Sequence, residues 1–338
     1  MFYYDEQGNI FKSKIDAIKV PQTCYFYYYD KEFLAANWKL EPNESLDELY
    51  KQRAQQLRDK YDRIVIAYSG GADSTCVLES FYYNNIHIDE ILVVGAFSQD
   101  SNFGSDENHN GEIYLNVKPT LNNLNLPNTK ITYCDYSLFL GDPNNFSLIK
   151  DCGTEYYKEI GSFFSIHNLF WRDIYKYIEK TNKSTAIVFG EDKPNILPEG
   201  DGFCAFFRDM SFNEYGNFQQ KDNYKKESFF ITPDFPQLTI KQHHILMRLY
   251  EYMVKEHKVL PYDKNELTIE RVLYKHKNPL QFISEKSKTK LLSARDQFIL
   301  NNTDSEIYKI YRDAMKKMCY DTHRHRESVF FTRKYYLR

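Results

Sequence analysis

The fold of this chain is decided by residues 63–82, which read RIVIAYSGGADSTCVLESFY. Arg63–Tyr68 is a short run dominated by apolar and branched residues, as is typical of a buried strand. Residues 69–74 combine two glycines with small polar residues, which favours a tight loop. The stretch that follows, STCVLESFYYNN, is predicted to be a helix entered through that loop. The sequence therefore predicts one strand–loop–helix unit.

The next segments repeat this alternation. Strands are predicted over 91–97, 130–136 and 184–192, and helices over 118–126 and 166–182. Only a short connection separates the first helix from the strand over 91–97, as expected for parallel neighbours in a βαβ unit. We therefore expect an α/β fold with an open, doubly wound, mostly parallel sheet of the Rossmann-like kind.

Two flanking segments differ from this core. The N-terminal segment is expected to contain short strands around a turn at Gln7–Asn9, a β-favouring run at 24–29, and a helix over 46–61 capped by residues 43–45. After about residue 200 irregular or short-strand pieces precede a mainly helical region. The predicted organisation is an N-terminal extension over 1–59, an α/β core over 60–200 and a mainly helical C-terminal region over 201–338.

Composition excludes several classes of protein. The chain has 338 residues, 42% hydrophobic and 27% charged, which does not fit a disordered, collagen-like or disulfide-stapled protein. No apolar run approaches the roughly 18 residues of a membrane-spanning helix. The first residues lack the pattern of a secretory signal, and the six cysteines show no zinc-binding spacing. We expect a soluble, cytoplasmic protein without a membrane partner.

Charge is unevenly distributed along the chain. The net charge is -12 over residues 1–240 and +9 over residues 241–338. Such asymmetry arises when two segments dock against each other or when a basic face binds nucleic acid. Acidic residues are interspersed among the basic ones, so docking is favoured and nucleic acid remains the alternative.

The loop at residues 69–74 has the composition of an anion site. Small residues at a strand-to-helix turn place backbone N–H groups at a helix N-terminus, where glycines let phosphate oxygens approach closely. Ser69 and Ser74 can donate to phosphate, and Asp73 can cap the helix or hold Mg²⁺. The loop lacks the lysine of a kinase-type P-loop and the glycine spacing of a dinucleotide fingerprint.

RIVIAYSGGADST resembles the SGGxDS signature of the PP-loop ATP pyrophosphatases, the adenine nucleotide alpha-hydrolase-like superfamily, whose fold is a doubly wound sheet of the HUP type. The resemblance implies an enzyme that cleaves ATP to AMP and pyrophosphate and adenylates a carbonyl or carboxylate for a nitrogen or sulfur nucleophile. It implies ATP and Mg²⁺ as ligands beside an unidentified acceptor substrate. The ATP-binding residues implied by the motif are Ser69, Gly70, Gly71, Ala72, Asp73 and Ser74.

The resemblance also suggests roles at the ends of other strands. Relatives read adenine through main-chain groups after the second strand, here Gly95, Ala96 and Phe97. After the fourth strand, Asp192 would bind Mg²⁺ together with Asp73, and Lys193 would act with Asp73 in catalysis by contacting the pyrophosphate. An ordinary polar turn ended by a proline remains the alternative for the residues after the fourth strand.

The polar segment after the second strand offers candidates for substrate contacts. They are Asp100, His109, Glu112 and Asn116. Each of these residues alone is more often a solvated loop residue than a ligand contact. The pair His243–His244 has no further histidine or cysteine at ligand spacing and is weak as a metal site.

Three functions remain open at this stage. An ATP-dependent ligase of an asparagine-synthetase-like or other ligase branch is favoured because the zinc-binding and paired cysteines of other branches are missing. A phosphoadenylyl-sulfate reductase-like or sulfurtransferase-like enzyme would need a redox cysteine. A non-catalytic nucleotide-binding module would use its basic C-terminal region for a partner. For the ligase, we expect residues 200–338 to close the acceptor side, with Lys241, Arg248 or Arg208 facing the phosphates.

Overall fold

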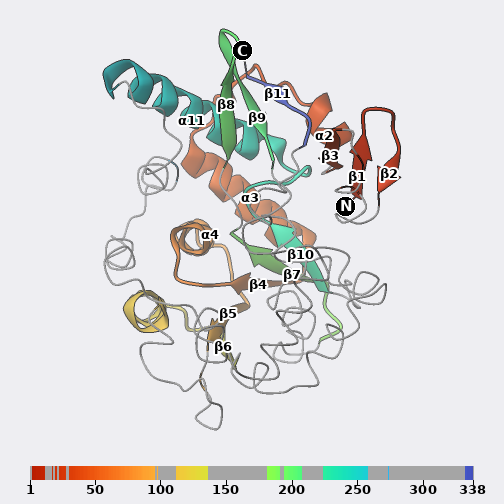
Figure 1. Cartoon of the computed structure of the whole chain (residues 1–338). Coiled ribbons are helices and arrows are strands. Elements are labelled where there is room, and N and C mark those ends of the chain that lie inside the picture. Colours follow the sequence, from red (N-terminus) through yellow and green to blue (C-terminus); the bar gives the residue numbers. More distant parts are fainter. Residues whose placement is uncertain are drawn as a thin grey trace, which may run out of the picture.

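The computed structural model describes part of the chain in detail. The described residues are 2–11, 17, 20, 23–27, 30–95, 97, 112–135, 181–190, 194–207, 224–257, 273 and 332–337. Figure 1 shows the elements that they form. The predicted helix over 166–182 falls almost entirely outside these residues.

A five-stranded parallel sheet forms the centre of the molecule. Its strands are β4 (Arg63–Ala67), β5 (Glu90–Gly95), β6 (Lys130–Asp135), β7 (Thr185–Phe189) and β10 (Tyr224–Ser228). They lie in the order β10-β7-β4-β5-β6, and every pairing is parallel. The predicted α/β fold with an open parallel sheet is confirmed.

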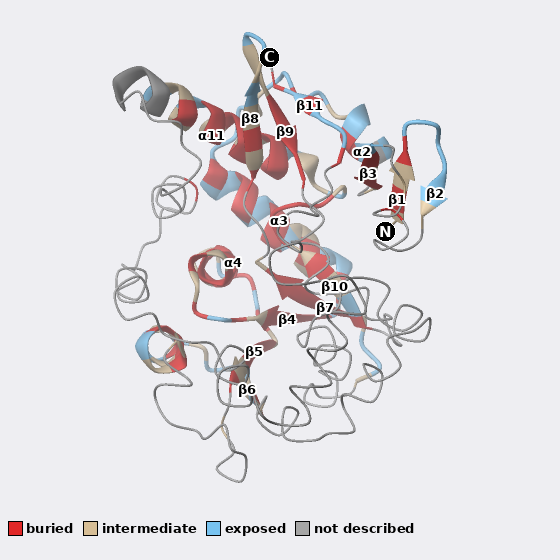
Figure 2. Ribbon diagram, viewed as in Figure 1, coloured by how far each residue is buried: buried red, intermediate tan, exposed pale blue. Residues whose placement is uncertain are grey.

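Helices alternate with these strands. They are α3 (Leu46–Lys60), α4 (Ala72–Tyr82), the π-helical turn η1 (Ile113–Val117) and α5 (Lys118–Asn123). α4 connects β4 to β5, and η1 with α5 lies between β5 and β6. α3 packs beside α4 and also contacts β4. The central strands β4 and β7 and most of α4 are buried (Figure 2), as a sheet covered by helices requires.

The predicted cap of α3 is confirmed. The backbone N–H of Glu48 donates to Ser45 Oγ at 3.2 Å, and the Glu48 carboxylate accepts from the Ser45 backbone N–H at 2.7 Å. This reciprocal pair satisfies two N–H groups that the first helical turn would otherwise leave without partners. This capping box fixes the first residue of α3, the helix that directly precedes the first strand of the central sheet.

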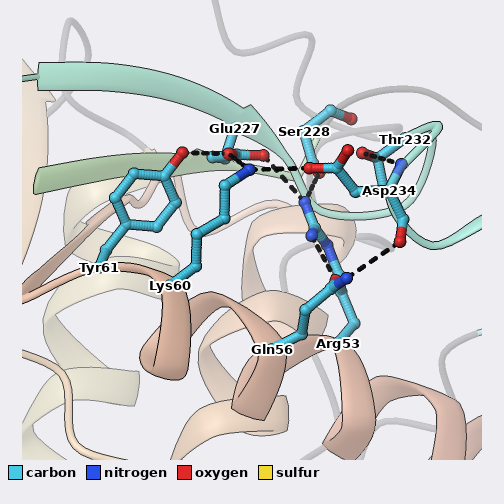
Figure 3. Close-up of polar contacts among 8 residues, drawn as sticks. All are labelled: Arg53, Gln56, Lys60, Tyr61, Glu227, Ser228, Thr232 and Asp234. Carbon is cyan, nitrogen blue, oxygen red and sulfur yellow. Dashed lines mark hydrogen bonds and ion pairs between the residues drawn. The ribbon is translucent and has the colours of Figure 1, made fainter.

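The fifth strand, β10, comes from beyond residue 200. Its sequence, YKKES, is too polar to be predicted as a strand of the central sheet. Figure 3 shows how it is held: Glu227 accepts hydrogen bonds from Arg53 (3.1 Å) and Lys60 (2.9 Å) of α3, and a short one from Tyr61. The Arg53 side chain is completely buried and also donates to the Ser228 carbonyl at 2.8 Å. This polar network ties the edge strand to α3.

Two small antiparallel sheets flank the central one. The first contains β1 (Phe2–Asp5), β2 (Ile10–Phe11) and β3 (Cys24–Tyr27), and the predicted turn after β1 includes Gly8 with φ of 87°. The second contains β8 (Asn195–Glu199), β9 (Gly202–Phe206) and β11 (Tyr335–Tyr336). The short helix α2 (Asp30–Ala35) follows β3.

The long helix α11 (Pro236–His257) belongs to the predicted helical region. It packs on α3 and contacts β8 (Figure 1). Within the described part of the chain, no helix is long and apolar enough to span a bilayer.

Candidate functional site

The candidate site lies where the strand order of the sheet reverses. From β4 the chain builds outward through β5 and β6, and then returns to place β7 on the opposite side of β4. The connections after β4 and β7 therefore lead to opposite sides of this point, and open parallel sheets commonly bind their ligands at the carboxyl ends of two such strands. The loop at 69–71 follows β4, and Gly190 follows β7.

Gly190 packs directly on the helix that begins at the loop. A β-carbon added to Gly190 would lie 2.7 Å from the carbonyl carbon and oxygen of Asp73 and 2.9 Å from the Ser74 nitrogen. These are backbone atoms that cannot rotate away, so only a residue without a side chain fits here. The end of β7 is thus in contact with the first turn of α4.

The loop is braced by its own hydroxyl groups. Ser74 Oγ accepts the Ser69 backbone N–H at 3.2 Å and lies 3.2 Å from the Gly71 carbonyl, to which it can donate. The Ser69 and Ser74 hydroxyl oxygens are 3.1 Å apart, and the Gly71 N–H donates to Ser69 Oγ at 3.3 Å. Ser74 is buried and Ser69 is exposed. Ser74 therefore holds the turn, whereas Ser69 is the hydroxyl that a ligand can reach.

Helix α4 begins directly after this loop, so its N-terminus lies at the loop. Gly71 is the N-cap with φ of -75° and ψ of 169°, and the first intrahelical bond is from Thr75 N–H to the Gly71 carbonyl at 3.0 Å. Gly71 has no side chain with which to cap the turn, and helix N-termini attract anions. Asp73 lies in this turn, half-buried. A single carboxylate suits Mg²⁺ that arrives with nucleotide phosphates, because this ion commonly takes one or two protein carboxylates together with phosphate oxygens.

Gly70, within the loop, packs against η1. Its φ is +77°, and a β-carbon there would lie 2.8 Å from Val117 Cγ2 and 3.0 Å from Asn116 Cβ. The Asn116 side-chain amide donates to the Gly70 carbonyl at 2.7 Å, and Asn116 is only 3% exposed. The sequence suggested Asn116 as a substrate contact, but the structure places it against the loop backbone.

At the end of β5, the predicted adenine-side residues are closely packed. A β-carbon on Gly95 would collide with Ile113 of η1 and with the Phe97 ring. The Phe97 N–H donates to Asp135 Oδ1 at 3.0 Å, so this amide already has a partner within the protein. This role of Asp135 was not predicted from the sequence. The feature that could have indicated it is that Asp135 is a carboxylate at the carboxyl end of β6, the strand next to β5.

Several predicted site residues lie outside the described residues. These are Ala96, Asp100, His109, Asp192, Lys193 and Arg208. Glu112 is described and stands half-buried immediately before η1.

The predicted basic residues of α11 have partners elsewhere. Lys241 forms an ion pair with Glu41 at 2.9 Å, and Arg248 pairs with the same carboxylate. These pairs join α11 to the segment before α3, and the structure therefore gives Lys241 and Arg248 a docking role in place of the expected contact with phosphates.

The histidine pair is also structural. His243 Nδ1 lies 2.7 Å from the Thr239 carbonyl and His244 Nε2 lies 2.8 Å from the Trp38 carbonyl, and both residues are buried. Among the described residues no three acidic, histidine or cysteine side chains gather as a metal cluster.

The described cysteines are buried thiols: Cys24, Cys76, Cys134 and Cys204. Burial raises the pKa of Cys134 to about 12, with a further contribution from the Glu90 charge. Burial likewise raises the pKa of Cys204 to about 12, assisted by Glu199. Such thiols are poor nucleophiles because the thiolate is the reactive form.

No known family model matches the chain, and no curated protein matches it in sequence.

Proposed function

We propose that this protein is an ATP-binding enzyme of the PP-loop type, which cleaves ATP to AMP and pyrophosphate while adenylating a carbonyl or carboxylate substrate. The observation that carries the proposal is the contact of Gly190, at the end of β7, with the Asp73–Ser74 backbone of α4. This contact supports the proposal because it brings the end of β7 to the first turn of α4, beside the SGGADS loop, where the strand order reverses and parallel sheets commonly bind ligands.

The loop residues would have distinct tasks. ATP phosphates would lie at the N-terminus of α4, with the exposed Ser69 hydroxyl as a donor and the buried Ser74 hydroxyl as the brace of the loop. Asp73 would hold Mg²⁺, which supplies charge neutralisation for the phosphates when it is bound. Asp192 and Lys193 follow Gly190 closely in sequence and are proposed to act at the same edge of the sheet.

In the proposed reaction, an oxygen of the acceptor attacks the α-phosphorus. A new oxygen–phosphorus bond forms, the bond from the α-phosphorus to the α–β bridging oxygen breaks, and pyrophosphate leaves with that electron pair. The protein contributes position and charge stabilisation, as in other phosphoryl and nucleotidyl transfers. A nitrogen or sulfur nucleophile would then displace AMP.

The buried thiols favour this ligase reaction over the reductase alternative. A sulfite-releasing reductase needs a reactive cysteine, and the four described cysteines are buried, with a raised pKa in each case. Only Cys152 and Cys319, outside the described residues, could serve that chemistry.

Calorimetric titration with ATP and Mg²⁺ tests the proposal. The wild-type protein should bind the nucleotide, and Ser69→Ala and Asp73→Ala should lose both binding strength and acceptor-dependent pyrophosphate release while remaining folded. Asp201→Ala, an exposed carboxylate in the turn between β8 and β9, is the matched control and should behave as wild type. Unchanged pyrophosphate release by Ser69→Ala or Asp73→Ala would refute the site. Binding without turnover across all acceptors would favour the non-catalytic module.

A further inference from the structure

We propose that Asn116 is a positioning residue that sets the orientation of the Gly70–Gly71 peptide for phosphate binding. The inference rests on the proposed function and adds a residue from outside the loop motif. Its basis is the juxtaposition of η1, which follows β5, with the loop that follows β4.

The hydrogen bond from Asn116 fixes one end of this peptide. Its side-chain amide donates to the Gly70 carbonyl at 2.7 Å, inside the protein. In a trans peptide the carbonyl and the following N–H point in opposite directions. With the Gly70 carbonyl turned toward η1, the Gly71 N–H is turned away from it, toward the side of Ser69 Oγ. Asn116 therefore helps to determine where an N–H of the anion site points.

Packing reinforces this orientation. Gly70 has a left-handed φ of +77°, and a β-carbon added there would lie 2.8 Å from Val117 Cγ2 and 3.0 Å from Asn116 Cβ, so there is no room for a side chain. η1 also presses on Gly95 at the end of β5. The π-helical turn thus spans the ends of two neighbouring strands, and such turns occur often at functional sites.

The chemistry of the contact requires a donor at position 116. A carbonyl accepts only, so an aspartate there would replace the donor with a charged acceptor, and alanine would leave a buried carbonyl without this partner. Either change would free the peptide to rotate. The loss should fall on binding of the phosphates and should spare the nucleoside.

The test compares two ligands on the full-length protein. Asn116→Asp and Asn116→Ala should weaken binding of ATP with Mg²⁺ by about tenfold, the effect expected for one hydrogen bond, and leave the affinity for adenosine unchanged. Asn123→Asp, at an exposed position of α5, is the matched control and should match wild type for both ligands. If Asn116→Asp does not fold, Asn116→Ser takes its place.

Hydrogen exchange of a peptide covering residues 69–74 gives a second readout without nucleotide. Exchange should be faster in the Asn116 variants than in wild type and in Asn123→Asp. If the Asn116 variants bind ATP as tightly as the wild-type protein does, or lose equal affinity for ATP and for adenosine, the proposed role of Asn116 is overturned and the proposed function is not. Failure of wild-type protein to bind ATP at all would instead overturn the proposed function, and this inference with it.

Discussion

A β-carbon on Gly190 would stand 2.7 Å from the carbonyl oxygen of Asp73. Gly190 directly follows β7 and Asp73 lies in the first turn of α4, so two connections from neighbouring strands meet without an intervening side chain. Gly70 against η1 and Gly95 against Ile113 repeat the arrangement along the same edge of the sheet. Glycines at the ends of three adjacent strands thus let the carboxyl edge pack tightly around the loop.

This contact predicts a steric penalty at position 190. Gly190→Ala should lower the free energy of unfolding by about 2 kcal/mol, since the α4 backbone must move to admit the methyl group. Gly71→Ala is the contrast: its β-carbon would meet only Ser69 Oγ, at 3.4 Å, and φ at Gly71 is -75°. Urea denaturation of both variants measures the difference. Equal stability of the two would mean that β7 does not press on α4.

The sequence predicted the central strands and the loop because each leaves a local signal. Apolar runs mark β4 and β7, glycines mark the turns, and Ser45 with Glu48 forms a capping box within four residues. Each of these features can be recognised from a few consecutive residues, without knowing which distant residues they contact.

Other features depend on contacts between distant residues. β10 is a polar segment whose place in the sheet depends on Glu227 meeting Arg53, 174 residues earlier. Asn116 lies in a polar stretch that looked like a substrate loop, and only the π-helical turn brings it to Gly70, 46 residues away. No pattern in a short stretch of sequence indicates either of these two contacts, so neither could be predicted from the sequence.

The Glu227 network predicts a large effect of charge removal. Glu227→Gln should cost about 3 kcal/mol of unfolding free energy, because the completely buried Arg53 side chain loses its counter-charge. Arg248→Gln, which removes from Glu41 an arginine side chain that is 49% exposed and leaves the Lys241–Glu41 pair in place, should cost less than about 1 kcal/mol. Chemical denaturation at neutral pH compares the two. A Glu227→Gln protein as stable as Arg248→Gln would show that the network does not secure β10.

Burial of His243 predicts a dependence of stability on pH. Burial, together with the nearby His244, lowers the pKa of His243 to about 4, and the Thr239 carbonyl opposes this shift. Between pH 6.5 and 4 the unfolded chain binds a proton at this residue that the folded protein does not, so stability falls as pH falls through that range. At pH 5 the loss should be about 2 kcal/mol relative to pH 7.

His243→Gln keeps a donor for the Thr239 carbonyl and cannot titrate, so its stability should change less between pH 7 and pH 5. The comparison is made by urea denaturation at the two pH values. Identical profiles for His243→Gln and wild type would show that His243 contributes nothing to the acid sensitivity.

The bond at which ATP is cleaved tests the central claim most directly. Wild-type protein is incubated with Mg²⁺ and ATP carrying distinct labels on the α- and γ-phosphorus, with amino acids, deazaguanine precursors and tRNA offered as acceptors. The proposed chemistry predicts AMP or an adenylated product together with pyrophosphate that retains the γ label, dependent on one acceptor and lost in Asp73→Ala. ADP and orthophosphate as the only products would contradict it.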